Sequence, residues 1–159
     1  MQIEGVINIA LDRDFTTVKI SAIAGNGLFA KKIIPSGTRI IEYKGERILK
    51  ENIVDDILNG LTTGIYVMKL NETMAIDGER NGNDARFINH HCSPNCTVYF
   101  FNEIPFVYAL REIVEGEELS FDYKLSAFNM GKKLTLEEQK EASPCFCNAA
   151  NCRGTLLVA

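Results

Sequence analysis

The stretch RFINHHCSPNC, residues 86–96, concentrates more chemistry than any other part of the chain. It holds both histidines, His90 and His91, and two of the five cysteines, Cys92 and Cys96. Side chains of these kinds bind metals, attack substrates or hold cofactors. Which of the three applies depends on the residues that the rest of the chain brings to this segment.

Length and composition set the first limits. The chain has 159 residues, of which 46% are hydrophobic, and this suffices for one hydrophobic core but not for two. We therefore expect a single folded body. The formal net charge of -4 argues against a nucleic-acid surface, because phosphate binding requires clustered Lys and Arg. A basic peptide or protein is the more suitable partner.

No export or membrane signal is recognisable in the sequence. The amino-terminal MQIEGVINIALDR lacks the basic start and the long apolar centre of a secretory signal. No apolar run reaches the ~18 residues that a membrane-spanning helix requires. We expect a soluble protein without a membrane partner, and the sequence gives no cellular address.

Short runs of β-branched and aromatic residues recur along the chain, separated by Gly, Pro and Asn. This pattern predicts a mostly β domain built from small sheets, with few helices. The expected strands are 16–24, 38–45, 65–70, 97–101, 105–110 and 118–123.

Two short helices are expected. The first lies within 50–61 and ends near Gly60, since apolar residues recur there at helical spacing; they are Ile53, Ile57, Leu58 and Leu61. The second, 135–142, opens with Thr135 followed by Glu138, which is the arrangement of a capping box.

The loop GNGLFA, residues 25–30, formally fits the G-x-G-x-x-A pattern of dinucleotide-binding proteins. Such a loop must open a helix whose amino terminus faces the pyrophosphate, whereas here Pro35 and a β-branched run follow. We therefore reject that interpretation. Two others stay open: a hairpin turn with glycines at positive φ, and a backbone kept free of side chains so that a cofactor can approach closely.

The tail CFCNAANCRGTL, residues 145–156, supplies three more thiols. A closed structural zinc site requires four ligands in a tetrahedron, so one ligand is missing. The candidates are Cys92, Cys96, His90 and His91, all in the opening segment, which predicts that the tail folds back onto it. An odd number of cysteines without an export signal makes disulfides the weaker interpretation, and three free thiols are a further alternative.

A catalytic interpretation of the same segment uses a His–Cys pair, or an open metal site of His90, His91 and Cys92 as in a zinc-dependent hydrolase. Adjacent residues of an extended chain point in opposite directions, so the two imidazoles do not readily face one metal. A structural hydrogen-bonding role is the more common one for a histidine.

The segment GEELSFDY, residues 116–123, continues an acidic run. We expect its early carboxylates to be solvated at a strand edge; these are Glu115, Glu117 and Glu118. Alternation then places Leu119, Phe121 and Tyr123 on one face. That face is either plain core or, if it lines a channel, an apolar slot with one hydroxyl group.

Taken together and in this order, GNGLFA, EYKG, YVMKL, RFINHHCSPNC, GEELSFDY and CFCNAANCRGTL resemble the SET-domain family of protein-lysine methyltransferases. The resemblance covers residues 16–157. It implies several small sheets around a pseudoknot, in which residues 86–96 thread beneath the strand that carries Phe121 and Tyr123, an exception to the usual avoidance of threaded chains. The implied parts are a SET domain at 16–124, a connector at 125–144 and a post-SET zinc-binding segment at 145–157.

The resemblance also implies an activity: transfer of methyl groups from S-adenosylmethionine to the ε-amine of a lysine in a protein. A basic segment such as a histone tail would suit the acidic run, since opposite charge steers encounter. The alternative is a SET-like module that binds peptides without catalysis. Such a module would be expected to have lost Tyr123, Asn89 or the glycine loop, and all three are present.

Residue roles follow from the same resemblance. Tyr123 and Tyr43 match the tyrosines of the lysine channel, and Phe121 matches the position at which phenylalanine leaves more room than tyrosine, which predicts di- or trimethylation. The implied cofactor-binding residues are Asn26, Gly27, Leu28, Tyr66, Arg86, Asn89, His90, Tyr123, Phe146 and Leu156. The implied structural zinc ligands are Cys92, Cys145, Cys147 and Cys152, which leaves Cys96 as a buried thiol.

Three positions depart from the family pattern: Gly78, His91 and Asn148. We expect these departures to be tolerated, because the positions require main chain more than a particular side chain.

Overall fold

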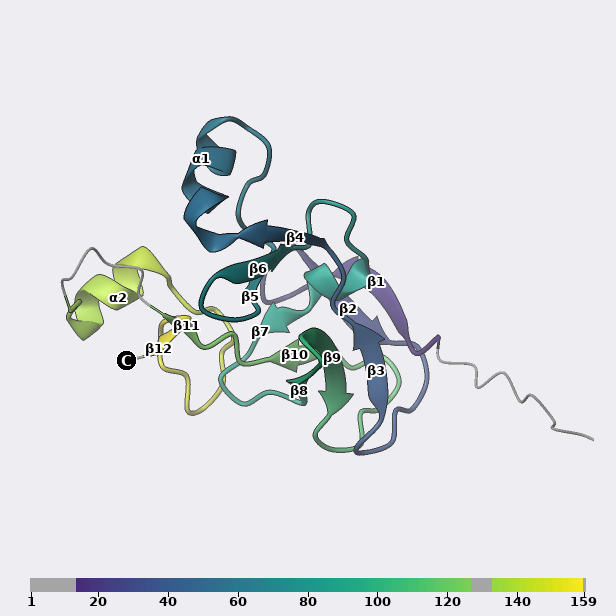
Figure 1. The fold of residues 1–159 in the computed structure, drawn as a ribbon. Helices are drawn as coiled ribbons and strands as arrows, with labels where there is room; N and C mark the ends of the chain where they lie inside the picture. The colour runs from purple at the N-terminus through teal and green to yellow at the C-terminus, as the bar shows by residue number, and fades with distance from the viewer. Residues whose placement is uncertain (1–13, 127–132, 159) are drawn as a thin grey trace, which may run out of the picture.

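The computed structural model describes residues 14–126 and 133–158. The amino-terminal MQIEGVINIALDR and residues 127–132 of the expected connector lie outside the described residues. Within the described part the strands form five small sheets, and two short α-helices accompany them (Figure 1). The mostly β fold of small sheets predicted from the sequence is confirmed.

Three of the sheets are antiparallel. β1 (Thr16–Ile20) pairs with β2 (Asn26–Ala30). A second sheet has the order β3 (Arg39–Glu42), β9 (Ile104–Ala109), β8 (Cys96–Phe101). A third has the order β4 (Glu46–Leu49), β6 (Met74–Asp77), β5 (Val67–Lys69). Each of the six expected strands overlaps one of these strands or β10 (Ser120–Phe121), although most of the observed strands are shorter than the apolar runs suggested.

Two parallel pairs join distant parts of the chain. β7 (Asn89–His90) pairs with β10 (Ser120–Phe121), and β11 (Leu125–Ser126) pairs with β12 (Leu157–Val158). The first pair places the RFINHHCSPNC segment beside the strand of Phe121, as the resemblance implies. The threading of one segment beneath the other stays a prediction.

Buried polar side chains fix the first of these pairs. The Ser120 N–H donates to Asn95 Oδ1 at 2.9 Å, and Asn95 Nδ2 donates to the Glu118 carbonyl at 2.8 Å. Asn95 is buried, so both ends of its amide are satisfied by main chain rather than by water. The turn Ser93-Pro94-Asn95 is therefore anchored to the acidic run.

The glycine loop forms a turn and then a strand. Gly25 has φ of +48° and closes the turn, and the Ser21 N–H donates to its carbonyl at 2.8 Å. The following five residues are β2, which sequence analysis did not predict as a strand. Leu28 and Ala30 of this strand are fully buried, so the loop also contributes to the core.

Both predicted helices are present. After the 3-10 turn η1 (Lys50–Asn52), α1 (Ile53–Leu58) leads to Gly60 at φ +71°. Its apolar side chains do not reach the core: Leu58 is 78% exposed. Among the described residues, we find no helix with the length and apolar character needed to cross a membrane.

Helix α2 (Leu136–Ala142) begins as predicted. Thr135 Oγ1 accepts the Glu138 N–H at 3.2 Å, and the Glu138 carboxylate accepts the Thr135 N–H at 2.8 Å. This capping box satisfies two donors that the first turn would leave open. In Figure 1, α2 lies with β11 and β12 at one side of the molecule.

The hydrophobic core lies between the β1–β2 pair, the β3–β9–β8 sheet and the β7–β10 pair. Its fully buried aliphatic side chains are Leu28, Ile34, Val107, Ile113 and Leu119. Tyr43, Ile88 and Phe121 belong to the same cluster. The predicted channel residues therefore line the edge of the core, where rigid neighbours hold them in place.

Candidate functional site

The glycine loop is tied to β7 by Asn89. Asn89 Nδ2 donates to the carbonyls of Ala24 and Asn26 at 3.1 Å each, and to the Glu118 carboxylate at 2.9 Å. Ser21 Oγ donates to the two oxygens of the same carboxylate at 2.7 and 2.9 Å. The glycine loop, β7 and the acidic run thus meet at the carboxylate of Glu118. These hydrogen bonds hold the backbone of residues 26–28 in a fixed position.

Glu117 and Glu118 are not freely solvated, so that expectation was wrong for both. Arg111 Nη1 donates to the Glu117 carboxylate at 3.1 Å, and Asn95 Nδ2 donates to it at 3.2 Å. The hydrogen bond from Arg111 lowers the pKa of Glu117, although burial opposes this. Apart from Arg111, the donors to these two carboxylates come from distant segments, which a local count of charges does not reveal; they are Ser21, Asn89 and Asn95. Glu115 is exposed as expected.

Gly27 is required for a close approach, but the group that approaches is a side chain of the same protein. A Cβ at this position would lie 2.4 Å from Glu118 Oε1 and 2.9 Å from its Cδ. A Cβ carbon does not make non-bonded contacts this short, so any other residue would displace the carboxylate that holds Ser21 and Asn89. The cofactor role of Asn26, Gly27 and Leu28 stays a prediction.

The two predicted channel tyrosines make the same kind of hydrogen bond. Tyr123 Oη donates to the Ile88 carbonyl at 2.6 Å, and Tyr43 Oη donates to the Tyr66 carbonyl at 2.8 Å. Each hydroxyl thus uses its hydrogen on main chain and keeps lone pairs that can accept a hydrogen bond from an amine. Burial raises the pKa of both phenols well above the ordinary range, so both are neutral near pH 7 and neither is a base.

Aromatic contacts fix the rings around Tyr123. The ring centroids of Phe121 and Tyr123 are 5.1 Å apart, and those of His90 and Tyr123 are 5.4 Å apart. Tyr43 and Phe121 belong to one hydrophobic cluster, and Tyr123 packs against it. The structure therefore brings together all three residues predicted for the lysine channel.

Arg86 carries an unused donor. Its guanidinium carbon lies 4.7 Å from the Phe87 ring centroid and 5.8 Å from that of Tyr66, and Nη1 donates to the Gly78 carbonyl at 3.4 Å. Its Nε is buried and has no hydrogen-bond partner within residues 14–126 and 133–158. An orphaned guanidinium donor fits an anionic group such as the carboxylate of an amino-acid cofactor.

His90 is 3% exposed, and both of its ring nitrogens face protein atoms. Nδ1 accepts the Tyr123 N–H at 3.1 Å, and Nε2 lies 3.3 Å from Cys92 Sγ. Burial lowers the pKa of His90, so the ring is neutral. His91 is partly exposed and its Nδ1 accepts the Ser93 N–H at 3.0 Å. The two imidazoles are engaged separately, which argues against a hydrolytic metal site.

Four cysteines converge as the tail folds back onto residues 86–96. The sulfurs of Cys92, Cys145, Cys147 and Cys152 all lie within 4.8 Å of one another, and those of Cys92 and Cys145 are 3.8 Å apart. A zinc tetrahedron with Zn–S bonds of about 2.3 Å has sulfur–sulfur edges of about 3.8 Å. The donor set therefore fits zinc. Cys96 is 1% exposed and lies outside this group, as a buried thiol.

Main-chain donors point at the sulfurs. The N–H groups of Arg153 and Gly154 donate to Cys92 Sγ at 3.4 Å and Cys152 Sγ at 3.3 Å, and that of Cys92 donates to Cys147 Sγ at 3.4 Å. Against the effect of burial, such bonds lower the pKa of Cys147 to about 6, whereas burial raises the pKa of Cys145 to about 12. Four adjacent thiolates repel, and a bound cation removes the conflict.

The tail also presents apolar side chains. Phe146, between two cluster cysteines, is 66% exposed, and Leu156 is partly buried. The Leu125 N–H donates to the Leu156 carbonyl at 3.3 Å, which holds the tail against the residues that follow Tyr123. An exposed phenylalanine at this place could cover a bound cofactor. The cofactor-binding role of Phe146 and Leu156 stays a prediction.

Several residues of the site escaped sequence analysis. Glu118 organises the glycine loop, Gly78 lies against Tyr43, and Arg153 forms a two-pronged ion pair with Asp122 at 2.7 and 3.0 Å. The position of Asp122 between Phe121 and Tyr123 was a signal that could have drawn attention to its partner. No pattern in the sequence indicates the other two contacts.

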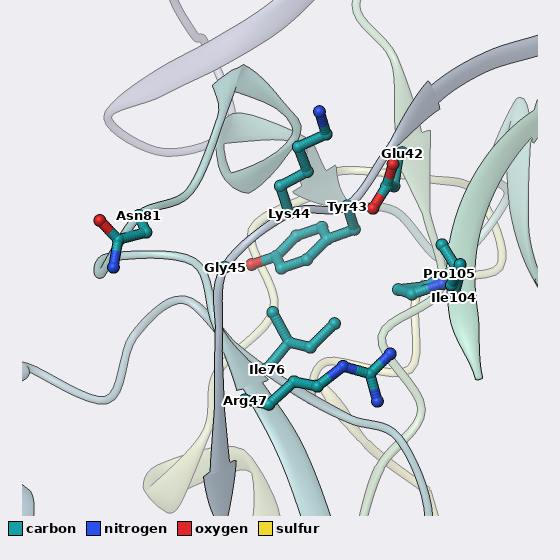
Figure 2. Close-up of a pocket in the computed structure, with 9 residues that line it drawn as sticks. All are labelled: Glu42, Tyr43, Lys44, Gly45, Arg47, Ile76, Asn81, Ile104 and Pro105. Carbon is teal, nitrogen blue, oxygen red and sulfur yellow. The ribbon is translucent and has the colours of Figure 1, made fainter.

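Two cavities adjoin the predicted site. The first, of about 240 Å³, is lined by Glu42, Tyr43, Lys44, Gly45, Arg47, Ile76, Asn81, Ile104 and Pro105. Figure 2 shows the Tyr43 ring among these residues, with Ile76 and Arg47 on one side of it and Lys44 on the other. The second, of about 260 Å³, lies between the 91–95 turn and the acidic run and includes Cys147.

Three features define a SET domain with a post-SET segment: small sheets accompanied by the β7–β10 pair, two tyrosines that pack in or against the cluster of Phe121, and a four-cysteine cluster from the tail. Residues 25–124, well over half of the chain, match the SET domain family, and the chain belongs to this family.

Its relatives carry descriptive names. The chain is 34% identical to the histone-lysine N-methyltransferase trithorax of Drosophila virilis, with 89% of this chain and 4% of the relative covered. It is 37% identical to the histone-lysine N-methyltransferase ash1 of Drosophila melanogaster, covering 86% of this chain and 6% of the relative. It is 39% identical to the Saccharomyces cerevisiae histone-lysine N-methyltransferase, H3 lysine-4 specific, covering 86% of this chain and 12% of the relative. The chain therefore spans a small fraction of the length of these relatives.

Proposed function

We propose that this chain is a protein-lysine methyltransferase that uses S-adenosylmethionine as methyl donor. The observation that carries the proposal is the arrangement of two phenols: Tyr123 and Tyr43 each donate to a main-chain carbonyl, and both pack in or against the hydrophobic cluster that contains Phe121. Membership of the SET domain family and the names of the relatives support it.

The cofactor would bind where the glycine loop, Asn89 and Arg86 meet. Backbone atoms of 26–28 are held by Asn89 and Glu118, the buried Nε of Arg86 is free for a carboxylate, and Phe146 is available as a cover. When bound, S-adenosylmethionine supplies a methyl group on a sulfonium sulfur, which is an excellent leaving group. The protein then has to position the lysine nitrogen in line with that group, and positioning of this kind is worth ~7 kcal/mol or more.

The lysine amine has to arrive neutral, although its ordinary pKa is about 10.4. The ring of Phe121 and the buried phenols form an apolar surrounding that disfavours the ammonium form. Lone pairs on Tyr123 Oη and Tyr43 Oη can then accept hydrogen bonds from the N–H groups of the amine. These bonds direct the nitrogen lone pair of the amine away from the two tyrosines. Both tyrosines orient the nucleophile, and their raised pKa values keep them protonated near pH 7, so that no phenolate is available to act as a base.

The role proposed for zinc is structural. Four cysteine sulfurs leave no coordination position open for water, which is the arrangement of a closed site. The cluster ties the tail to Cys92 and so brings Phe146 and Leu156 toward the predicted cofactor site. The division into SET domain (16–124), connector (125–144) and post-SET segment (145–157) remains our working description.

For the substrate we propose a lysine in a basic protein segment, with histone tails as the leading candidates. The names of the relatives specify histone lysine as their target, and the net charge of -4 favours encounter with a basic peptide. A second possibility, binding of such a peptide without methyl transfer, is separated from the first by turnover alone.

The test is to incubate the purified chain with methyl-labelled S-adenosylmethionine and histone H3, H4 or whole-cell extract, and to map the labelled lysine. We expect Tyr123→Phe to reduce turnover by about 100-fold or more, because a group that orients the nucleophile is lost. Tyr99→Phe is the matched control, since Tyr99 is 60% exposed on β8 and far in sequence from the predicted channel. Equal turnover in the two variants would refute the assignment, and binding of peptide without any label transfer would favour the non-catalytic module.

A further inference from the structure

The two peptide groups that flank Tyr123 are both linked, through hydrogen bonds of other side chains, to the sulfur of Cys92. On one side, the Tyr123 N–H donates to His90 Nδ1 at 3.1 Å, and His90 Nε2 lies 3.3 Å from Cys92 Sγ. Because Nδ1 accepts a hydrogen bond, the hydrogen of the neutral ring lies on Nε2 and points to the sulfur. His90 thus links the main chain of Tyr123 directly to the cysteine cluster.

The second connection runs through Asp122. Its carboxylate accepts two hydrogen bonds from Arg153, Nη1 to Oδ2 at 2.7 Å and Nη2 to Oδ1 at 3.0 Å, and also the Lys124 N–H at 3.0 Å. The Arg153 N–H donates to Cys92 Sγ at 3.4 Å. The side chains of Arg153 and Asp122 are both partly buried, and partial burial makes a bidentate ion pair stronger than an exposed one.

We infer that His90, Asp122 and Arg153 are positioning residues that couple the four-cysteine cluster to the placement of Tyr123. Both connections end at Cys92 Sγ, which receives the His90 and Arg153 donors together. A metal ion bound by the four sulfurs would fix the position of Cys92 Sγ, and with it the positions of the two donors that contact this sulfur. The two connections therefore tighten when the cluster holds its metal and loosen when it does not.

This inference goes beyond a cluster that merely fastens the tail. The tail is already held by the β11–β12 pair and by the bond from the Leu125 N–H to the Leu156 carbonyl. The His90 and Asp122 connections also reach the two peptide groups that flank Tyr123, since His90 accepts the Tyr123 N–H and Asp122 accepts the Lys124 N–H. Their proposed effect is on the orientation of the Tyr123 ring, next to Phe121 at 5.1 Å.

The first test needs no enzymatic activity. The chain contains five tyrosines and can be labelled with 3-fluorotyrosine, with the Tyr123 signal identified by its absence in Tyr123→Phe. We expect the fluorine resonance of Tyr123 to move when zinc is added to the metal-free chain, while those of Tyr99 and Tyr108 on the β3–β9–β8 sheet stay in place. In Asp122→Asn the zinc-dependent movement should fall to less than about half, since one connection is lost.

Two results of this experiment would overturn the inference: a Tyr123 resonance that is the same with and without zinc, or a movement that Asp122→Asn leaves at full size. If all five resonances moved together, the cluster would be a general stabiliser and the inference would also be wrong. Zinc content of Asp122→Asn, measured with a metal-sensitive dye, should stay at one ion per chain. None of these readouts depends on the proposed function.

The second test rests on the proposed function and uses steady-state kinetics. Asp122→Asn should lower kcat by about tenfold, as expected for a misplaced catalytic group, and change KM for S-adenosylmethionine by less than about twofold. The matched control is Glu72→Gln, which makes the same carboxylate-to-amide change in the exposed Lys69–Glu72 pair and should leave kcat unchanged. Combining Asp122→Arg with Arg153→Asp should restore part of the kcat that either change alone removes. Without turnover in the unmodified chain the proposed function fails, whereas turnover that is insensitive to Asp122→Asn contradicts only the coupling.

Discussion

Gly78 lies directly against the hydroxyl of Tyr43: a Cβ built on Gly78 would be 2.9 Å from Tyr43 Oη and 3.2 Å from two carbons of its ring. Gly78 also donates its N–H to the Tyr66 carbonyl at 2.8 Å, the same oxygen that accepts the Tyr43 hydroxyl. The missing side chain therefore allows Tyr43 to sit against the main chain. The position departs from the family pattern, and the structure shows which neighbour makes use of the space.

Gly78→Ala should push the Tyr43 ring away from the Tyr66 carbonyl by a few tenths of an ångström. We expect turnover to fall by about tenfold, because the amine-accepting oxygen moves with the ring. A double-mutant cycle with Tyr43→Phe checks the cause, since removing Oη removes the atom that Cβ meets. Additive losses in the cycle would show that Gly78 acts through something other than Tyr43.

Phe121→Tyr should shift the products toward fewer methyl groups. Phe121 is buried and its ring lies 5.1 Å from that of Tyr123, so an added hydroxyl occupies space beside the phenol that orients the amine. A buried hydroxyl also requires a partner, and a water molecule held there would take up the room of an additional methyl group. Mass spectrometry of the product peptide measures the ratio of mono-, di- and trimethyl-lysine. An unchanged ratio would remove Phe121 from the residues that limit methylation.

The predictions that came from local chemistry agree well with the structure. The capping box of Thr135 and Glu138 is present, because both partners lie within one turn of the same helix. The β-branched runs form strands for a similar reason. Predictions that depended on distant partners agreed less well. Spacing indicated a helix within 50–61 but not that Leu58 would be exposed. Charge counting did not find Asn95 and Asn89, the distant donors that bind Glu117 and Glu118.

The prediction of the cysteine cluster depended partly on local chemistry and partly on a distant partner. Residue chemistry alone left four candidates for the fourth ligand, and only the family resemblance singled out Cys92. Since β7, β8 and the turn between them fix which side chains face the tail, the choice depends on tertiary structure that no local pattern encodes. The structure places Cys92 with the tail sulfurs and Cys96 in the core, two environments separated by four residues.

Cys152→Ser should therefore lose zinc, whereas Cys96→Ala should keep it. Removing one of four thiolates leaves an incomplete tetrahedron, and the bound metal contributes directly to stability. Zinc per chain, measured by a metal-sensitive dye after gel filtration, is expected to fall in the first variant and to stay at the unmodified value in the second. A cavity at Cys96 costs about 1 kcal/mol and lowers the melting temperature modestly. Loss of zinc from Cys96→Ala would mean that the ligand set is wrong.

Stability should decrease in alkaline solution because of the buried phenols. Folding raises the pKa of Tyr43 and Tyr123 above the ordinary value of 10.0, so the folded chain holds these protons when the unfolded chain releases them. Their contribution to the free energy of unfolding is complete below pH 10.0 and decreases as pH rises from there through the higher folded pKa. In urea titrations from about pH 9 to about pH 11, Tyr43→Phe should lose less stability than the unmodified chain. Tyr99→Phe, which removes an exposed phenol, should follow the unmodified chain, and a Tyr43→Phe curve of the same slope would contradict the argument.

The tail closure also sets an order of events during synthesis. Cys92 and Cys145 are 53 residues apart, and β11 has to wait for β12, so a nascent chain that has emerged only as far as α2 holds one cluster sulfur and an unpaired β11. Such a chain already contains the glycine loop, Tyr43 and Tyr123, but not the tail residues that carry Phe146 and the other three cluster sulfurs. Synthesis of residues 145–158 is thus the step that completes the cysteine cluster and the β11–β12 pair, and a chain that stops before Cys152 lacks both.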